Sequence, residues 1–360
     1  MELRQLRIDN LRLFEHVEIE PEPGWNLFLG ANGAGKTSVL EAAFLLSHGR
    51  SFRTSLKDAL VRRGTNGYAV FGELHGAEGS SLRRVGLARN AGGLEARLEG
   101  EVVPAAELMR HTAVLCFEPG SHELVSGASE ERRRFLDWGV FHVEHEFLAI
   151  WRRYQRALKQ RNALLRAEPS PSALDAWDHE LAQSAEPLVQ MRARYFQSLE
   201  PLVVALLAEL LSELGAARLR FDAGYDLARD FQDVLAAQRG RDLARGYTAS
   251  GPHRMDWSIS FEQAPRREHL SRGQEKLCAF AAVMAQAHLF RQTSGEWPIL
   301  CLDDLASEVD RDHQERIVAS IAASAAQVFV TGTQEPEALA KQGAPLTRFH
   351  VEQGHVTRLL

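Results

Sequence analysis

The sequence predicts an α/β protein whose sheet-forming parts are separated by a mostly helical segment. Three observations support this: an apolar run at 25–29 followed by a glycine-rich loop and a helical pattern, a helical stretch from about 130 to 215, and strand-like segments that return after it. The chain has 360 residues, 45% of them hydrophobic and 25% charged. This is enough for two or three structural units, and the composition is that of a globular protein rather than a disordered or fibrous one.

The individual elements follow from the spacing of apolar residues and from the residues that end each run. Before the helical segment, strands are expected at 2–9, 25–29, 68–74, 83–88, 94–98 and 113–117. A helix is expected at 38–46, with Gly49 ending it. After the helical segment, strands are expected at 218–221, 256–261, 299–302 and 328–330, with a helix from Ser271.

The helical segment separates two parts of one α/β unit. A break at 168–172 predicts an antiparallel pair of helices, with Pro187 and Pro201 interrupting its second half. We expect residues 1–120 and 250–360 to form the α/β lobe and 121–249 a mostly helical insert. The pattern allows either a plain helical subdomain or a projecting arm.

The segment after the 25–29 strand matches the phosphate-loop pattern G-x-x-x-x-G-K-[ST] at every fixed position. It consists of Gly30, Ala31, Asn32, Gly33, Ala34, Gly35, Lys36 and Thr37. Glycines let such a loop turn its N–H groups toward phosphate oxygens, while Lys36 supplies a positive charge and the Thr37 hydroxyl a ligand for Mg²⁺. The strand before the loop and the helix after it are the context that this motif requires.

Two more segments have the chemistry of a nucleotide site. The apolar run 299–302 ends in Asp303 and Asp304, where the first acid would hold Mg²⁺ and the second would position a water molecule. Two adjacent acids also suit a solvated turn. Ser271 and Gln274 form an S-x-x-Q capping box, which by itself predicts only a well-capped helix.

Charge and cysteine content limit the class of protein. There are 42 Lys and Arg residues against 48 Asp and Glu, and the resulting charge of −6 does not by itself suggest a nucleic-acid partner. Three Cys form no disulfide set or metal-binding motif, the N-terminal residues show no apolar leader, and no apolar run approaches a membrane span. We therefore expect a cytoplasmic protein with no membrane partner.

The order of phosphate loop, Ser-x-Gly-Gln segment and double-acid strand resembles the head of ABC-type ATPases. More specifically, the chain resembles the RecF family of bacterial DNA replication and repair proteins, relatives of the structural-maintenance-of-chromosomes ATPases. The matching segments are Leu6 to Arg12, Leu40 to Ala42, Gly49 to Arg53, Ser129 to Asp137, Ser250 to Arg254, Leu270 to Gln274 and Leu302 to Asp310. The resemblance implies an ABC-type P-loop ATPase head, a mixed sheet with flanking helices, carrying an inserted helical arm.

The resemblance also implies a function. ATP and Mg²⁺ would lie on the phosphate loop, with Lys36, Asp303, Asp304, Ser271 and Gln274 as catalytic residues and with Thr37 and Asp303 as metal ligands. Two copies would enclose ATP between the phosphate loop of one and the Ser271 region of the other, and weak DNA-stimulated hydrolysis would time their release. The implied partners are duplex DNA at junctions with single-stranded gaps, and the RecO and RecR proteins that load recombinase.

Two departures from ABC-type heads bear on hydrolysis. Asp304 stands where most such heads have Glu, so the shorter side chain is expected to position the attacking water less well. No switch His follows the 328–330 strand, which leaves Thr331 and Thr333 as candidate γ-phosphate sensors. Arg133 and Arg254 are alternative nucleotide sensors.

We expect basic residues to contact DNA. Of the 42 basic residues, 37 are Arg and only five are Lys, and this preference for Arg is explained either by codon usage or by bidentate contacts with phosphate. The first candidate cluster is Arg50, Arg53, Lys57, Arg62 and Arg63. The second is Arg152, Arg153, Arg156, Lys159, Arg161 and Arg166, which a solvated helix face would explain equally well. Residues 296–315 alone carry a charge of −6, so the rest of the chain balances to zero and leaves room for a basic surface.

Two other function classes stay open at this stage. One is the nucleotide-binding subunit of an ABC-type transporter, against which the helical insert, Asp304 and the missing His all count. The other is an ATP-gated clamp that does not hydrolyse ATP.

Overall fold

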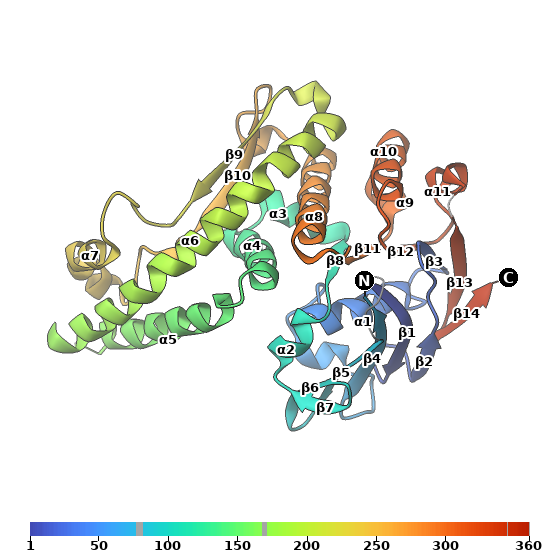
Figure 1. Ribbon diagram of the computed structural model, residues 1–360, viewed down its shortest axis with the longest axis horizontal. Helices are drawn as coiled ribbons and strands as arrows, with labels where there is room; N and C mark the ends of the chain where they lie inside the picture. The colour runs from blue at the N-terminus through green and yellow to red at the C-terminus, as the bar shows by residue number, and fades with distance from the viewer. Residues whose placement is uncertain (77–81, 168–170, 344, 360) are drawn as a thin grey trace. The chain divides into compact units, whose positions relative to one another are not determined.

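The computed structural model describes residues 1–76, 82–167, 171–343 and 345–359 (Figure 1). The chain forms two compact units, Met1–Ser121 with Ala279–Leu360, and His122–Cys278. The first division lies beside the expected one at 120, but the second lies at 278 rather than 249. The boundary lies later because strand β10 (Asp256–Phe261) pairs along its whole length with β9 (Ala217–Asp222), which is part of the second unit.

One sheet of the first unit has the order β14-β13-β3-β12-β11-β8. Its strands are β3 (Trp25–Leu29), β8 (Val114–Phe117), β11 (Ile299–Leu302), β12 (Val328–Gly332), β13 (Leu346–Glu352) and β14 (His355–Leu359). All neighbours are parallel except β13 and β14. The carboxyl ends of β3, β11 and β12 therefore lie at one edge, which is where α/β sheets bind ligands.

The second sheet of this unit is antiparallel, in the order β2-β1-β4-β5-β6-β7. Its strands are β1 (Glu2–Asp9), β2 (His16–Ile19), β4 (Tyr68–His75), β5 (Arg83–Asn90), β6 (Gly93–Leu98) and β7 (Glu101–Val103). Helix α1 (Lys36–His48) contacts strands of both sheets, and Val39, Leu40 and Leu45 are fully buried between them. Because α1 is buried along most of its length, its apolar residues are not confined to one stripe.

Helix α8 (Arg272–Ser294) belongs to the first unit from Ala279 on, and the remaining helices of this unit are short. They are α2 (Ala105–Arg110), α9 (Leu305–Glu308), α10 (Arg311–Ala322) and α11 (Glu337–Gln342). Single 3-10 turns occur at Lys57–Leu60, Pro119–His122, Ser212–Leu214, Pro252–Arg254 and Arg267–His269 of the chain. The helix predicted at 38–46 and the predicted strands are all present, those at 218–221 and 256–261 as β9 and β10 of the second unit and the others in this unit.

The second unit is mostly helical. It contains α3 (Glu123–Ser126), α4 (Ser129–Val143), α5 (Phe147–Leu165), α6 (Pro171–Leu210), α7 (Phe231–Arg245), the β9–β10 ribbon and the first residues of α8 (Arg272–Ser294). Helices α5 and α6 lie side by side (Figure 1) and are antiparallel, as contacts of Arg161 with Asp178 and of Arg153 with Glu180 show. The antiparallel helical pair is confirmed, although residues 168–170 of the predicted break lie outside the described residues.

The prediction that Pro187 and Pro201 interrupt the second helix is wrong. Helix α6 continues through both prolines from Pro171 to Leu210. Each proline removes one backbone N–H donor, which is costly in a helix that stands alone. Here Leu181, Leu188 and Leu207 are fully buried, and α6 packs against α4, α5, α7 and β9. Tertiary packing on several sides outweighs the local preference.

Within the described ranges, no helix is both long and apolar enough to cross a membrane.

Candidate phosphate-binding site

The loop between β3 and α1 has the backbone that the sequence motif predicts. Gly33 and Gly35 lie at φ 81° and 114°, the left-handed region that side chains disfavour. A Cβ on Gly30 would come within 2.1 Å of the Val351 carbonyl oxygen, so only glycine fits there. A Cβ on Gly33 would meet nothing within 4 Å, so the loop has open space beside it. Helix α1 begins directly after this loop, which directs its N-terminal N–H groups toward the same space.

Lys36 lies at the start of α1, and its side chain is largely buried. Its Nζ donates hydrogen bonds to the carbonyl oxygens of Gly30 at 2.8 Å and Ala31 at 2.9 Å. Burial lowers the pKa of Lys36, and the negative charges of Asp304 and Asp303 act against this shift. The ammonium group is thus held over the loop, within electrostatic reach of the acids that follow β11.

Thr37 and Asp303 meet where β3 and β11 end. The Thr37 hydroxyl donates to Asp303 Oδ1 at 2.9 Å, and the Thr331 hydroxyl donates to the same oxygen at 2.6 Å. Asp303 is 6% exposed, and burial raises its pKa, while the two hydroxyl donors and the charge of Arg53 lower it. Hydroxyl and carboxylate oxygens are the ligands that Mg²⁺ prefers, so this pair fits the metal that the motif predicts.

Asp304 has a strained backbone, with φ 53° in the left-handed region. Its N–H donates to the Thr331 hydroxyl at 2.9 Å. Thr331 therefore binds both acids at once, through a hydroxyl that donates to Asp303 and accepts from Asp304. The only proton of the Thr331 hydroxyl is donated to Asp303, while Thr333 is exposed, and a sensor role for either residue stays a prediction.

Ser271 and Gln274 form the predicted capping box in the second unit. The Gln274 N–H donates to Ser271 Oγ at 3.2 Å, and the Ser271 N–H donates to Gln274 Oε1 at 3.0 Å. The box begins α8, a helix that runs from Arg272 to Ser294, and Ser271 is exposed at its positive end. The capping prediction is confirmed, and the role of this end in a dimer stays a prediction.

The first basic cluster lies on residues 50–63, which we call the basic loop. Arg50, Arg53, Lys57 and Arg63 are exposed. Arg62 is partly exposed and bound to Glu15 at 2.8 Å. Arg53 differs from the others because its charge reaches Asp303, a link to the phosphate site that a count of basic residues could not reveal.

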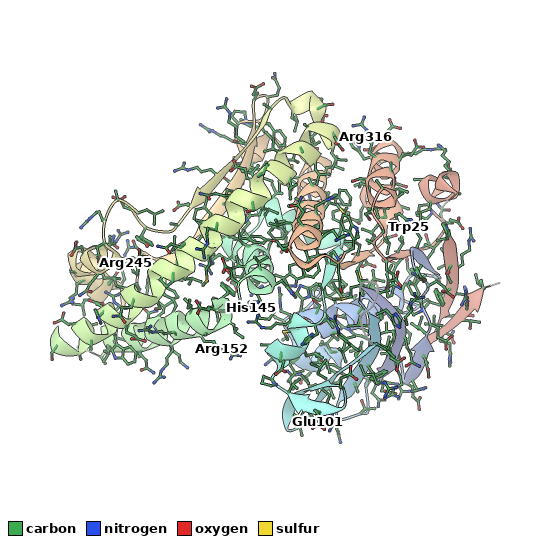
Figure 2. All side chains as sticks on the ribbon, viewed as in Figure 1. Trp25, Glu101, His145, Arg152, Arg245 and Arg316 are labelled. Atoms are coloured by element: carbon green, nitrogen blue, oxygen red, sulfur yellow. The ribbon has the colours of Figure 1, made fainter. Side chains whose placement is uncertain are left out.

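The second basic cluster is only partly a surface. Arg152, Arg156 and Lys159 are exposed on α5, where Figure 2 shows Arg152. Arg153 is exposed but forms a bidentate ion pair with Glu180 at 2.6 and 2.9 Å. An open pocket on this surface is lined by Arg152, Arg153, Arg156 and Glu180 together with Ala157, Ala176 and Trp177, but not by Lys159.

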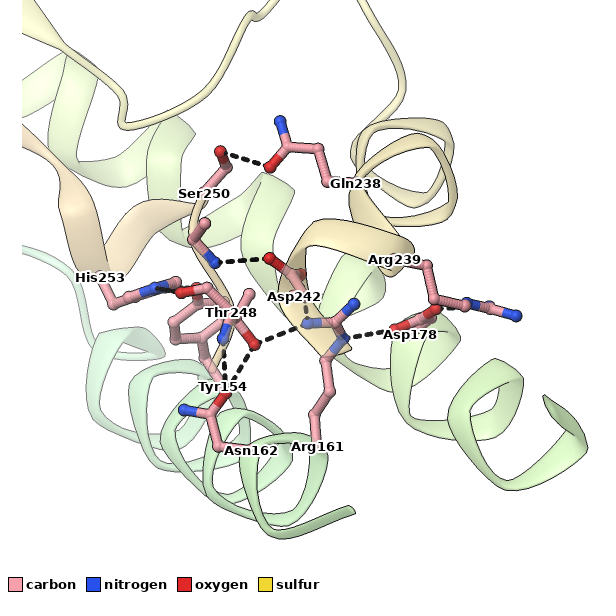
Figure 3. A network of polar contacts seen from close by, with 11 residues as sticks. Tyr154, Arg161, Asn162, Asp178, Gln238, Arg239, Asp242, Thr248, Ser250 and His253 are labelled. Carbon is pink, nitrogen blue, oxygen red and sulfur yellow. Dashed lines mark hydrogen bonds and ion pairs between the residues drawn. The ribbon is translucent and has the colours of Figure 1, made fainter. Parts of the chain in front are cut away.

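Arg161 does not belong to that surface, so its place among the DNA contacts is wrong. Its side chain is fully buried and binds Asp178 at 2.5 Å, Asp242 at 2.7 Å and Thr248 at 2.8 Å (Figure 3). The acids that pair with Arg161 lie on α6 and α7. The sequence of α5 alone gives no sign of them. Arg166 is exposed, and its Nε donates to the Gly246 carbonyl oxygen at 3.2 Å.

The two alternative sensors lie in the second unit. Arg133 donates from Nη1 to the Met255 carbonyl oxygen and to Ser129 Oγ, both at 2.8 Å. Arg133 thus binds the backbone at the end of the segment 250–255. Arg254 is exposed, with its guanidinium 5.4 Å from the centre of the Tyr247 ring.

Comparison with known proteins decides the family. The family model described as RecF/RecN/SMC N terminal domain matches residues 2–357. A protein of Xanthomonas euvesicatoria pv. vesicatoria named DNA replication and repair protein RecF is 49% identical, over 99% of each chain. This chain belongs to the RecF family. A RecF protein of Stenotrophomonas maltophilia is 47% identical over 99% of each chain.

Solved structures support the fold. The chain matches a structure described as the recombination mediator protein RecF-ATPrS in the RecFOR pathway, with a TM-score of 0.88, 24% identity, and coverage of 100% of this chain and 98% of the other. An Smc head domain from Pyrococcus furiosus gives a TM-score of 0.57 at 13% identity, over 99% and 95% of the two chains. The predicted ABC-type head and the RecF resemblance are confirmed, and none of these relatives supports a transporter subunit.

Proposed function

We propose that this chain binds ATP and Mg²⁺ at the phosphate loop and acts as an ATP-dependent DNA-binding protein of recombinational repair and replication restart. The hydrogen bond between Thr37 and Asp303 supports this most directly. It joins the hydroxyl of the phosphate loop to the acid of β11 at the edge where three parallel strands end. The solved structures described as RecF-ATPrS and RecF-ATP, which are similar in fold to this chain, agree with binding of ATP.

The phosphate chain of ATP would lie on the loop N–H groups and the N-terminus of α1. Lys36 would turn its ammonium from the Gly30 and Ala31 carbonyl oxygens, 2.8 and 2.9 Å away, to the β and γ phosphates. Thr37 and Asp303 would hold Mg²⁺, which neutralises charge on the phosphates when bound. Thr331 keeps Asp303 in place, because its hydroxyl donates to the same carboxylate oxygen.

Asp304 would act as the base that positions the attacking water. The bond from its N–H to Thr331 holds its backbone, so the reach of the carboxylate depends on the side chain alone. Since Asp is one methylene shorter than Glu, the water is held less well and turnover is slow. Slow hydrolysis suits a timer that releases DNA.

ATP would also join two copies of the chain. The exposed, capped N-terminus of α8 at Ser271 carries the positive end of a helix dipole and suits the γ-phosphate held by a second copy. Because ATP would bind both copies only when they are joined, nucleotide binding stabilises the dimer, and hydrolysis releases it.

The DNA partner would be a duplex near a single-stranded gap, where the protein aids RecO and RecR in loading recombinase. The basic loop offers exposed Arg50, Arg53, Lys57 and Arg63 for phosphate contacts. Arg152, Arg156 and Lys159 on α5 form a second, separate candidate surface.

A measurement of nucleotide affinity and phosphate release tests this function. We expect tight, Mg²⁺-dependent binding of a fluorescent ATP analogue, with slow phosphate release that a gapped duplex accelerates. ATP binding and DNA binding with no phosphate release would favour the non-hydrolysing clamp. Absence of ATP binding would contradict the proposal altogether.

A further inference from the structure

A buried carboxylate on α1 has no part in the phosphate chemistry described above. Glu41 is fully buried, and it accepts two hydrogen bonds from Arg12, from Nε at 2.8 Å and from Nη2 at 2.7 Å. A third comes from the hydroxyl of Ser51, which is itself buried. A buried carboxylate is costly unless such donors satisfy it, so this arrangement holds its members in one geometry.

Both partners of Glu41 connect to the basic loop. Ser51 Oγ accepts from the N–H of Arg53 at 2.9 Å and from that of Thr54 at 3.2 Å. Near the end of the basic loop, Arg12 Nη1 donates to the Ala59 carbonyl oxygen at 2.7 Å. The backbone N–H of Arg12 donates to the Leu60 carbonyl oxygen at 2.8 Å. Glu41 therefore holds the basic loop near its start and its end.

The same helix connects Glu41 to the phosphate site. Glu41 lies four residues after Thr37, which places the two side chains on one face of α1, a single turn apart. Thr37 in turn donates to Asp303 at 2.9 Å. The loop has a second attachment to α1, because the Phe52 ring packs edge-on against Phe44 with 5.3 Å between centroids. Movement of the loop at Ser51 thus acts on the helix that carries Thr37.

We propose that Glu41 is a positioning residue that couples the basic loop to the phosphate site, so that DNA bound by the loop changes the rate of hydrolysis. The coupling runs from the loop through Ser51 and Glu41 to the face of α1 that carries Thr37. It also sets the position of Arg53, whose backbone N–H is bound by the same serine hydroxyl. This inference rests on the proposed function, because it requires both hydrolysis and DNA binding.

The test removes one hydroxyl from this chain of contacts. Ser51→Ala separates the loop from Glu41 but leaves the Arg12 pair in place, and Ser51→Thr restores a hydroxyl. Ser47→Ala is the matched control, because Ser47 is also buried on α1 but its hydroxyl binds the Val114 N–H instead. The readouts are the affinity for a fluorescent ATP analogue, the affinity for a gapped duplex, and phosphate release with and without that duplex.

We expect Ser51→Ala to bind ATP and DNA within about twofold of wild type but to lose DNA stimulation by about tenfold or more, since small displacements of charged groups cost up to about 100-fold in turnover. Ser51→Thr should recover stimulation, and Ser47→Ala should retain it. If Ser51→Ala does not fold, Arg12→Lys replaces it, since Lys keeps the charge beside Glu41 but loses the fork that reaches Ala59; the same loss is expected.

Wild-type stimulation that the Ser51→Ala variant retains would overturn this inference alone. A uniform loss of ATP binding, basal release and thermal stability in Ser51→Ala that Ser51→Thr does not rescue would also overturn it, because it would show a purely structural role. Absence of DNA stimulation in the wild type would overturn the proposed function and this inference with it.

Discussion

At the residue scale, the phosphate site depends on a few hydroxyl groups that hold the acids in place. Thr37 and Thr331 both donate to Asp303, and Thr331 also accepts from the Asp304 N–H. The Asp303 carboxylate is thus held by two hydroxyl donors, while Asp304 is held through its backbone N–H. This difference agrees with the separate roles proposed for these two neighbouring carboxylates.

The first prediction concerns Asp304. We expect Asp304→Asn to lower phosphate release by at least about 100-fold, the usual loss when a general base is removed, while leaving ATP affinity nearly unchanged. Asp303→Asn should instead weaken the dependence of ATP binding on Mg²⁺. Phosphate release and fluorescent ATP binding measured on both variants separate the two effects. Full turnover in Asp304→Asn would show that another group positions the water.

The second prediction concerns His253 in the second unit. Burial lowers the pKa of His253 to about 4, against a contribution from the Thr248 carbonyl that raises it. The ring lies between the Tyr154 hydroxyl, 2.7 Å from Nδ1, and the Thr248 oxygen, 3.0 Å from Nε2 (Figure 3). Between pH 6.5 and 4 the unfolded chain binds a proton that the folded chain does not, so stability falls as the pH falls, by up to about 3 kcal/mol.

Denaturant unfolding followed across this pH range measures the effect. We expect the wild type to lose more stability than His253→Gln between pH 6.5 and 4. His269→Gln is the control, since His269 is exposed in the same unit, and it should follow the wild-type curve. Parallel curves for wild type and His253→Gln would show that this histidine is not kept neutral by the fold.

At the element scale, the second unit is held together by a charged group inside it. Arg161 on α5 is fully buried between Asp178 of α6 and Asp242 of α7. Arg239 donates to Asp178 (Figure 3) and also to Asp175, so the network extends along α6. Three helices therefore share one set of ion pairs, and loss of the central arginine leaves buried acids without their partner.

The third prediction follows from this network. Arg161→Met should lower the free energy of unfolding by about 3 to 5 kcal/mol, the cost of breaking a buried ion pair on one side. Lys159→Met is the control, because it removes an exposed charge two residues away and should change stability by less than about 0.5 kcal/mol. Chemical denaturation checks both. Equal stability of the two variants would refute the structural role of Arg161.

These elements show how far a single sequence predicts the structure. Strand–loop–helix context and the S-x-x-Q spacing are local, and both the phosphate loop and the capping box were predictable. The burial of Arg161 depends on acids 17 and 81 residues away, and the continuity of α6 through Pro187 depends on packing by other elements. The bond from Thr331 to Asp303 likewise joins residues that only the sheet brings together. Local sequence patterns do not indicate such distant partners.

At the scale of the whole molecule, the proposed function involves DNA and a second copy of the chain. The net charge of −6 is not spread evenly, because residues 296–315 account for all of it. The basic loop supplies exposed positive charge in the first unit, and residues 152, 156 and 159 do so in the second. Phosphate contacts by such groups make affinity depend on salt.

The fourth prediction tests the basic loop as a DNA surface. Lys57 and Arg63 suit the test, since Arg62 is bound to Glu15 and the charge of Arg53 acts on Asp303. Replacing both with Gln should reduce the log–log salt slope of duplex affinity by about 2, close to one unit for each lost phosphate contact. The double variant Lys341→Gln with Arg348→Gln is the control, because these two basic side chains form ion pairs with Glu315 and Glu335. An unchanged slope in the test variant would remove the loop from the DNA surface.

The fifth prediction concerns the exposed N-terminus of α8. Ser271→Arg should leave ATP binding intact but prevent ATP-induced dimers, since a bulky side chain would stand where the second copy presents its nucleotide. Ser271→Thr keeps the helix cap and should dimerise as the wild type does. A dimer formed by Ser271→Arg would place the interface elsewhere.

In the proposed function, ATP joins two copies of this chain on DNA. Gel filtration with light scattering, with and without ATP and Mg²⁺ and then with a gapped duplex, tests it most directly. We expect the 40.2 kDa of one chain without nucleotide, twice that mass with ATP and Mg²⁺, and a dimer that elutes with the duplex. One mass throughout, unchanged by ATP in the presence or absence of DNA, would contradict it.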